Sequence, residues 1–422
     1  MYTRQKNHRI VFYVFSILVA VTIPLAEVSD VKYNSIAIII LAANWVLEGN
    51  YREKIERLRG NKIVLIFMSP FILNVLGLAY STDISSGIKY IVLNLSVFLM
   101  PLIYGSSYPF DKDQTNRIGL AFTASVILCT FYLFKDGFVY TFGDLYNPHF
   151  IAILKREIIG RTYASIYLTF ILFILYIRFF AVEKKYAYRN ILIILITAYV
   201  VYLNGILIVK TTILASFLIA FTLIAIYLVK AKKWTYFISL ISACFLISVI
   251  FYYSTPKISD NVSKIIHAQP IEIRGSGVNF EMNSFSTRST IWGAAIEVLR
   301  ENNNWLIGVG TGDEKSALKE KYIQKKLPDI LYLDVHNEYL QTWLRNGIAG
   351  LIILLCCLIL PFIAAFKTNN YLYMSFLLLC FLCFFTESWF GRQTGIVFYS
   401  FFNAILFFGN TRPLFQGEVF QK

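Results

Sequence analysis

The segment GIAGLIILLCCLILPFIAAF, residues 347–366, has no charged side chain over its whole length. About 20 apolar residues in a helix cross the hydrocarbon core of a bilayer. The rest of the 422-residue chain has the same character, because 57% of its residues are hydrophobic and only 15% are charged. This composition excludes an ordinary soluble globular protein and indicates an integral membrane protein.

Apolar segments of similar length recur along the chain, and they predict an all-α integral membrane protein with about twelve transmembrane helices. The predicted spans are residues 10–27, 33–48, 63–80, 86–104, 118–134, 162–181, 190–208, 212–229, 234–253, 347–366, 371–389 and 394–409. The first span lacks a small-residue cleavage site and runs directly into further spans, so we expect it to be retained rather than removed as a signal peptide.

The basic residues are distributed unevenly between the two sides of the predicted spans. With the amino terminus inside, the short cytoplasmic segments carry 19 Lys and Arg, whereas the short loops on the opposite side carry 7. Cytoplasmic segments of membrane proteins carry the excess of positive charge. We therefore expect both termini to be cytoplasmic, and the net charge of +14 reports membrane orientation rather than nucleic-acid binding.

One long polar stretch, residues 254–345, interrupts the series of spans. We expect transmembrane helices one to nine in residues 1–253, a mainly helical external loop in residues 254–345, and helices ten to twelve with a cytoplasmic tail in residues 346–422. Helical patterns within the loop cover residues 286–302 and 314–326. A protein that only spans the bilayer has no need of such a loop, so we expect it to carry the function.

His336 is one of four histidines, and it lies where the loop returns to the membrane. The spacing of His336, Tyr339 and Trp343 predicts a helix that begins at the histidine and continues into the tenth span. A neutral imidazole is a competent general base near pH 7. The alternative is that His336 only caps an interfacial helix, and the two aromatic residues either stack on sugar rings or pack the loop.

Three basic residues lie near the external edge of the predicted bilayer. Arg288 is in the first turn of a loop helix, Arg161 precedes the sixth span, and Lys210 lies between the seventh and eighth. Cations at this level suit a lipid-linked pyrophosphate, which Arg binds through two parallel hydrogen bonds and Lys as a point charge. The alternative for each is that its side chain extends into the headgroup layer.

Two other features have competing interpretations. No strand precedes the Gly308-x-Gly310-x-Gly312 pattern, so nucleotide binding is disfavoured, and a tight turn is the expected role, with exposed amides near an anionic ligand as a second one. Glu387 and Arg392 bracket the last external turn. They either take part in the function or neutralise each other as an ion pair.

These features together resemble the O-antigen ligase family, which includes related O-antigen polymerases and protein-glycan ligases. The resemblance covers most of the chain and is strongest over residues 155–350. The stretches that carry it are His336-Asn337 followed by nine residues and Gly347, and residues 161–167, 286–292 and 308–312.

The resemblance implies a membrane glycosyltransferase of the GT-C type that uses an undecaprenyl-diphosphate-linked glycan as donor, with no metal and no other cofactor. It implies that His336 activates the acceptor hydroxyl and that Arg288 contacts the donor diphosphate. Lys210 lies where many members carry an arginine, and Arg161 matches a basic position more loosely. The candidate substrate contacts are Asn337 and Tyr339.

Three functions remain open at this point. The leading one is an O-antigen ligase of lipopolysaccharide biosynthesis, which transfers a glycan to lipid A-core at the periplasmic face of the bacterial inner membrane. The alternative is a polymerase that joins one lipid-linked repeat unit to another with the same donor chemistry. A polysaccharide flippase or transporter would place ionisable residues along a central path, and few charges lie within the predicted spans.

Overall fold

The structure is a computed structural model that describes residues 2–26, 33–141, 161–181, 187–207, 209–239, 241–242 and 284–409. Every regular element in these ranges is a helix, which confirms the all-α class for the described residues. The chain forms two compact units, Met1–Ser216 with Thr287–Lys422, and Phe217–Ser286. The side-chain contacts discussed below all lie within the first unit.

The α-helices are, in chain order, α1 (Tyr2–Leu25), α2 (Tyr33–Glu48), α3 (Tyr51–Gly60), α4 (Ile63–Leu78), α5 (Ile84–Leu93), α6 (Leu95–Ser106), α7 (Lys112–Thr141), α9 (Arg161–Ala181), α10 (Ala187–Leu207), α11 (Lys210–Lys230), α14 (Ser284–Arg300), α15 (Asn304–Ile307), α16 (Glu314–Gln324), α17 (Glu338–Lys367), α18 (Tyr371–Cys383) and α19 (Gln393–Phe408). Short 3-10 helices are η1 (Glu301–Asn303), η2 (Pro328–Ile330) and η3 (Trp389–Gly391).

Several of these helices have the length and composition of membrane spans. Five described segments qualify, one of which combines α5 and α6, and α3 with α4 would make a sixth, although the two are bent by 96° where they meet. Four further apolar helices are shorter: α2 and most of α9 lie between these segments in the chain, and α18 and α19 follow the last of them. The described residues therefore indicate a multi-pass membrane protein, while the predicted number of twelve spans is not confirmed. Most of the predicted ninth span lies outside the described residues.

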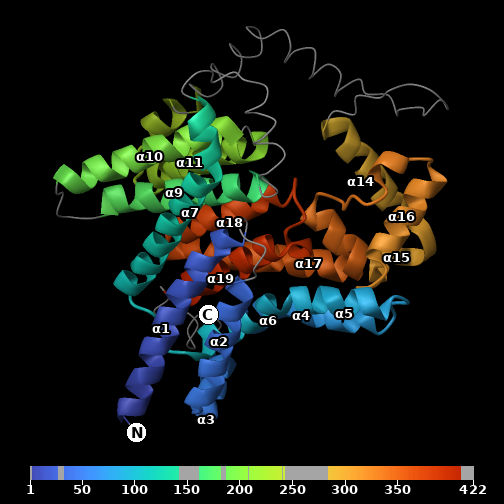
Figure 1. Cartoon of the computed structure of the whole chain (residues 1–422), viewed down its shortest axis with the longest axis horizontal. Coiled ribbons are helices and arrows are strands. Elements are labelled where there is room, and N and C mark those ends of the chain that lie inside the picture. Colours follow the sequence, from blue (N-terminus) through green and yellow to red (C-terminus); the bar gives the residue numbers. More distant parts are fainter. Residues whose placement is uncertain are drawn as a thin grey trace. The chain divides into compact units, whose positions relative to one another are not determined.

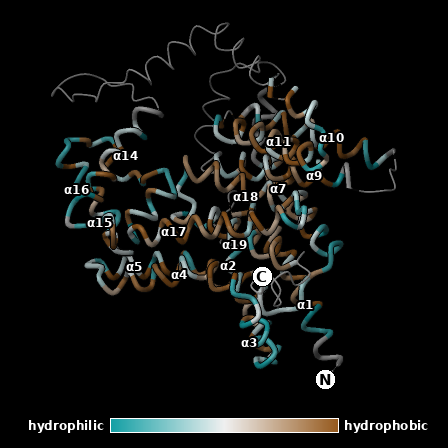
Figure 2. The backbone as a smooth tube through the Cα atoms, turned by 180° about the vertical axis from the view of Figure 1, so that it is seen from behind, coloured by the Kyte–Doolittle hydropathy of each residue, from teal (hydrophilic) through white to brown (hydrophobic). Residues whose placement is uncertain are grey.

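Helix α19 lies in the core of the first unit. All of its residues from Gly395 to Phe408 are buried, as expected of a helix that is apolar on every side. Phe398 and Phe402 pack their rings against Phe170 of α9 and Phe376 of α18, with ring centroids between 4.9 and 6.1 Å apart. Helices α17 and α19 are hydrophobic along most of their length, whereas α3 and α16 are polar (Figure 2).

The described part of residues 254–345, the segment expected to be an external loop, is mainly helical, with α14 and α16 close to their predicted positions. Between them, residues 308–312 form the predicted tight turn, in which Gly308 and Gly310 have positive φ angles of 84° and 100°. The turn lies against α4 and α17, which also pack together (Figure 1).

The backbone amides of this turn are all used within the protein. Val309 N donates to Leu344 O at 2.9 Å, Gly310 N to Arg345 O at 3.1 Å, and Gly312 N to Ser81 Oγ at 3.0 Å. Gly308 N and Thr311 N donate to backbone carbonyls as well. The turn therefore joins the loop to the membrane helices, and its amides are not directed at an anionic ligand.

A buried ion pair reinforces this junction. Arg345 of α17 is 2% exposed, and its guanidinium pairs with the Glu314 carboxylate of α16. The same guanidinium lies 3.8 Å from the ring centre of Tyr90 on α5 and donates to its hydroxyl. Gln341 Nε2 donates to Glu314 Oε1 at 2.7 Å. Burial raises the pKa of Glu314, and the Arg345 guanidinium counteracts that effect.

We expect Glu314→Ala to destabilise the protein by about 3–5 kcal/mol, because it leaves the buried Arg345 without its counter-ion. Glu297→Ala is the matched control. Its carboxylate pairs with Lys325 at 2.6 Å but is 45% exposed, so the loss should stay below about 1 kcal/mol. Unfolding midpoints of both purified variants measure the difference, and equal shifts would contradict a structural role for the buried pair.

Candidate active site

Helix α14 positions Arg288 and supports the segment that leads to His336. Its buried residues Ile291, Ala295 and Val298 recur at helical spacing and hold it against the rest of the unit. One turn after Arg288, Trp292 donates from Nε1 to the carbonyl of Val335 at 3.0 Å. The residue directly before His336 is therefore fixed to the helix that carries Arg288.

His336 lies outside the helix that the sequence predicted to begin with it. Helix α17 starts at Glu338, and the Asn337 side chain caps it by accepting a hydrogen bond from Leu340 N at 3.0 Å. Asn is among the preferred residues at this position. His336 itself has a left-handed backbone with φ of 50°. The predicted helical start was wrong by two residues because the cap residue follows the histidine.

The ring of His336 is partly buried, and its environment differs at its two nitrogens. The side chain is 22% exposed, yet Nδ1 is buried and lies 3.5 Å from Glu387 Oε2. The accessible part of the imidazole is therefore the part away from Nδ1. A ring with one nitrogen facing a carboxylate and the rest accessible has the arrangement expected of a general base.

Glu387 links the histidine to the loop arginine. Its other oxygen, Oε1, lies 3.7 Å from Arg288 Nη2, and the same nitrogen donates to the carbonyl of Thr386 at 3.1 Å. The Glu387 side chain is 11% exposed. The three side chains come from α14, the segment before α17 and the turn after α18, so they meet only in the folded chain.

Glu387 does not form an ion pair with Arg392, which was one of its two interpretations. Arg392 is exposed, and no ion pair of its side chain occurs among the described residues. Of the two interpretations of Glu387, the structure favours participation in the cluster around His336.

Glu338 holds the turn that carries Glu387, a role that sequence reasoning missed. Its side chain is fully buried and accepts hydrogen bonds from Phe390 N at 2.8 Å and Thr342 Oγ1 at 3.0 Å. Its backbone N donates to Phe384 O at 2.7 Å. The start of α17 is therefore bonded to Phe384, before Glu387 in the chain, and to Phe390, after it. The signal in the sequence that could have indicated this role is the position of the Glu338 carboxylate directly after the capping Asn337.

The two aromatic residues that follow His336 are used in packing. Tyr339 donates from its hydroxyl to Phe381 O at 2.8 Å, and its ring lies 4.7 Å from that of Phe385. Trp343 donates from Nε1 to Trp305 O at 2.8 Å. Asn337 is occupied as a helix cap. The structure thus gives Asn337 and Tyr339 structural contacts, and their contact with substrate stays a prediction.

Arg161 and Lys210 are the first residues of α9 and α11. These two helix starts are neighbours, because Ser165 Oγ lies 2.6 Å from Thr212 Oγ1. Helix α9 also reaches the turn after Glu387, since the rings of Tyr163 and Trp389 are 6.2 Å apart. The Lys210 side chain is exposed, and that of Arg161 lies outside the described side chains.

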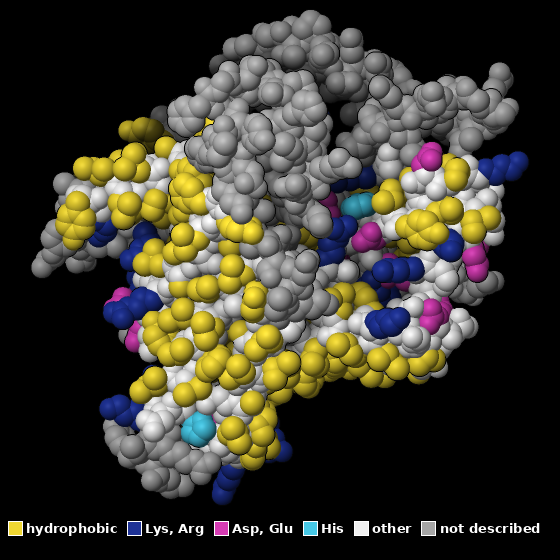
Figure 3. Space-filling view, viewed as in Figure 1, with side chains coloured by type: hydrophobic (Ala, Val, Ile, Leu, Met, Phe, Trp, Pro, Cys, Tyr) yellow, Lys and Arg dark blue, Asp and Glu magenta, His cyan; other side chains and the backbone are white. Residues whose placement is uncertain are grey.

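Figure 3 shows where the charged side chains gather on one side of the molecule. Basic and acidic groups surround a histidine between α14 and α18, and apolar side chains dominate the surface of the neighbouring helices. The described residues contain two histidines, and His8 lies at the start of the chain. No group of three His, Cys, Asp or Glu suited to a metal ion occurs among the described residues.

The helices and this cluster define a multi-pass membrane protein with partly accessible ionisable residues between its apolar segments. A family model described as O-antigen ligase matches residues 192–355, which supports assignment of the chain to the O-antigen ligase family, as the resemblance predicted. The family is one of glycosyltransferase-like enzymes. The matched region contains Lys210, Arg288 and His336, and ends before Glu387. Comparison with curated proteins finds no match.

A glycine break in α17 separates the site from the apolar helix. Gly347 has φ of 64° inside α17, and a Cβ there would collide with the carbonyl of Leu306.

We expect Gly347→Ala to destabilise the protein by roughly 2 kcal/mol or more, because it adds backbone strain to this collision. Gly293→Ala is the control, since that helical glycine has open space around it and should stabilise slightly. The unfolding midpoints of the two purified variants measure the difference. Equal shifts for Gly347→Ala and Gly293→Ala would contradict the explanation by strain and collision at Gly347.

Proposed function

We propose that the protein is a membrane glycosyltransferase that moves a glycan from an undecaprenyl-diphosphate carrier to lipid A-core at the periplasmic face of the inner membrane. The observation that carries the proposal is the His336 imidazole, accessible on one side and 3.5 Å from Glu387 Oε2 on the other. The family match over residues 192–355 supports this class of enzyme.

In the proposed reaction, His336 accepts the proton of the acceptor hydroxyl through Nε2. The hydroxyl oxygen attacks the anomeric carbon of the donor sugar, and the bond between that carbon and the diphosphate oxygen breaks. Glu387 holds the ring and stabilises the positive imidazolium that forms. The glycan ends on the acceptor, and the polyprenyl diphosphate leaves with the bonding electron pair.

Basic residues would stabilise the negative charge that develops on the leaving diphosphate. Arg288 lies beside the base through Glu387, and its planar guanidinium suits phosphate oxygens. Lys210 and Arg161 begin two adjacent helices and would add charge to the same region. The Arg288 guanidinium cannot pair fully with a diphosphate and with Glu387 at the same time. We therefore expect donor binding to lengthen the 3.7 Å contact between Arg288 and Glu387.

The surrounding architecture belongs to the same proposal. We assign residues 254–345 as the periplasmic loop between the ninth and tenth of twelve spans in a GT-C type fold, with both termini in the cytoplasm. Residues 1–253 would form the first nine spans, and residues 346–422 the last three with the tail. The mechanism needs no metal, because His336 supplies the base and the cations supply the charge. The family match is equally compatible with a polymerase, which would use this donor site with a second lipid-linked glycan as acceptor.

We expect purified protein to transfer glycan from the undecaprenyl-diphosphate donor to lipid A-core with EDTA present, and His336→Ala to lose at least about 10²-fold in rate because it lacks the base. Gel mobility of the product measures transfer. Tyr332→Ala is the control, because this residue is 84% exposed in the same segment. Elongation of the lipid-linked glycan without core attachment would identify a polymerase, and full activity of His336→Ala would refute the assigned base.

We expect Glu387→Gln to lower kcat by roughly 10–100-fold with little change in the KM for the acceptor, because it removes the charge that stabilises the imidazolium while keeping the shape. Arg392→Gln, an exposed change in the same turn, should leave kcat unaltered. Single-turnover rates with saturating donor measure both. A rise in KM alone, or a loss of kcat in both variants, would show that Glu387 does not act through His336.

A further inference from the structure

A cavity that shares no residue with this site lies among the first turns of α1, the end of α2 and the residues after α6. Its volume is about 220 Å³, and it is bordered by Lys6, Arg9, Phe12, Trp45, Ser107 and Tyr108. Nothing in the proposed glycosyl transfer uses these residues. Two cations, a serine hydroxyl and three aromatic rings around one cavity suggest a ligand that is both anionic and amphipathic.

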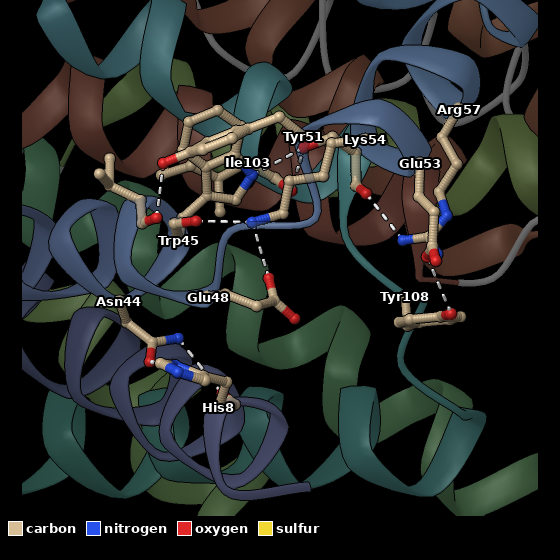
Figure 4. Close-up of polar contacts among 12 residues, drawn as sticks. His8, Asn44, Trp45, Glu48, Tyr51, Glu53, Lys54, Arg57, Ile103 and Tyr108 are labelled. Carbon is tan, nitrogen blue, oxygen red and sulfur yellow. Dashed lines mark hydrogen bonds and ion pairs between the residues drawn. The ribbon is translucent and has the colours of Figure 1, made fainter. Parts of the chain in front are cut away.

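The walls of the cavity are fixed by hydrogen bonds between the helices (Figure 4). His8 Nδ1 lies 2.8 Å from Asn44 Oδ1, and Asn44 Nδ2 donates to the carbonyl of His8 at 3.2 Å. Trp45 donates from Nε1 to Ser106 Oγ at 2.8 Å. These contacts hold α1, α2 and α6 together around the cavity, so its shape exists before a ligand arrives.

The one carboxylate that borders the cavity is already neutralised. Glu48 lies 2.8 Å from the ammonium of Lys54, whose side chain is 3% exposed. That ammonium also donates to the carbonyl of Trp45 and lies 4.6 Å from the Trp45 ring centre. In contrast, neither Lys6 nor Arg9 has an ion-pair partner among the described residues. The cavity therefore carries a positive charge that the described protein groups leave unbalanced.

An apolar stripe leads away from these cations along α1. Lys6, Ile10, Val14 and Leu18 follow each other at intervals of four residues and so lie on one side of the helix. Ile10 is 52% exposed, Val14 44% and Leu18 39%. The stripe lies within Lys6–Leu25, a helix long and apolar enough to cross a membrane. A charged end and an apolar stripe of this kind match the headgroup and acyl chain of one phospholipid.

We propose that this cavity binds an anionic phospholipid of the surrounding bilayer. Lys6 and Arg9 pair with the phosphate, Ser107 donates a hydrogen bond to it, and an acyl chain lies along Ile10, Val14 and Leu18. Trp45 and Tyr108 occupy the level of the membrane interface, where aromatic residues are enriched. Basic pockets between membrane helices are a known way of recognising such headgroups.

The proposal is tested with delipidated full-length protein in neutral detergent, titrated with phosphatidylglycerol or phosphatidylcholine and followed by native mass spectrometry. We expect phosphatidylglycerol to bind and phosphatidylcholine to bind at least about tenfold more weakly. The double variant Lys6→Ala/Arg9→Ala should bind phosphatidylglycerol roughly tenfold or more weakly than wild type, whereas Lys6→Arg/Arg9→Lys should retain binding. Ser107→Phe should also weaken binding, because it fills the cavity without changing the charge.

The matched control is Arg52→Ala/Arg59→Ala, which removes two exposed cations from α3 outside the cavity. It should bind phosphatidylglycerol like wild type. Equal weakening in this control would show that net charge alone attracts the lipid and would overturn the proposal. Equal affinity for phosphatidylcholine would overturn it as well. Displacement of phosphatidylglycerol by inorganic phosphate at similar concentrations would identify a site for a free anion instead. The unfolding midpoint of every variant shows whether it is folded.

Discussion

The first turns of α17 contain charged side chains with almost no contact to solvent, and such charges are stable only when partners surround them. Arg345 finds Glu314 on α16 and Tyr90 on α5, while Glu338 finds Phe390 and Thr342. These partners come from the loop, the membrane helices and the turn before α19. Satisfying the charges of one helix therefore brings together the three regions that surround His336.

The candidate site inherits its geometry from this arrangement. Asn337 caps α17 directly after His336, and Glu338 holds the turn that carries Glu387. The backbone next to His336 and the backbone next to Glu387 are therefore both fixed. Trp292 adds a third restraint through Val335. The His336 side chain itself makes few contacts. The position of His336 is set by neighbours such as Asn337 and Glu338, which are buried and hydrogen-bonded.

The sequence allowed the all-α class, α14, α16 and the turn at residues 308–312 to be predicted, because hydropathy, helical spacing and glycine are local signals. It also gave His336 and Arg288 as candidates and considered Glu387, and the structure brings these three side chains together. It could not identify the partner of Glu387, since proximity in the chain favoured Arg392, whereas Arg288 is about a hundred residues away. Nor could it separate the helix cap from the histidine, or recognise Glu338 and Arg345 as parts of a buried network. Such pairings depend on how distant elements pack.

The left-handed backbone of His336 has a consequence for any attempt to engineer this protein. A residue with a side chain at φ of 50° is strained by roughly 1–2 kcal/mol, whereas glycine adopts this conformation freely. A search for more stable variants would therefore favour glycine at the position of the proposed base. Selection for thermal stability alone would remove that imidazole, so added stability would have to be sought elsewhere in the chain.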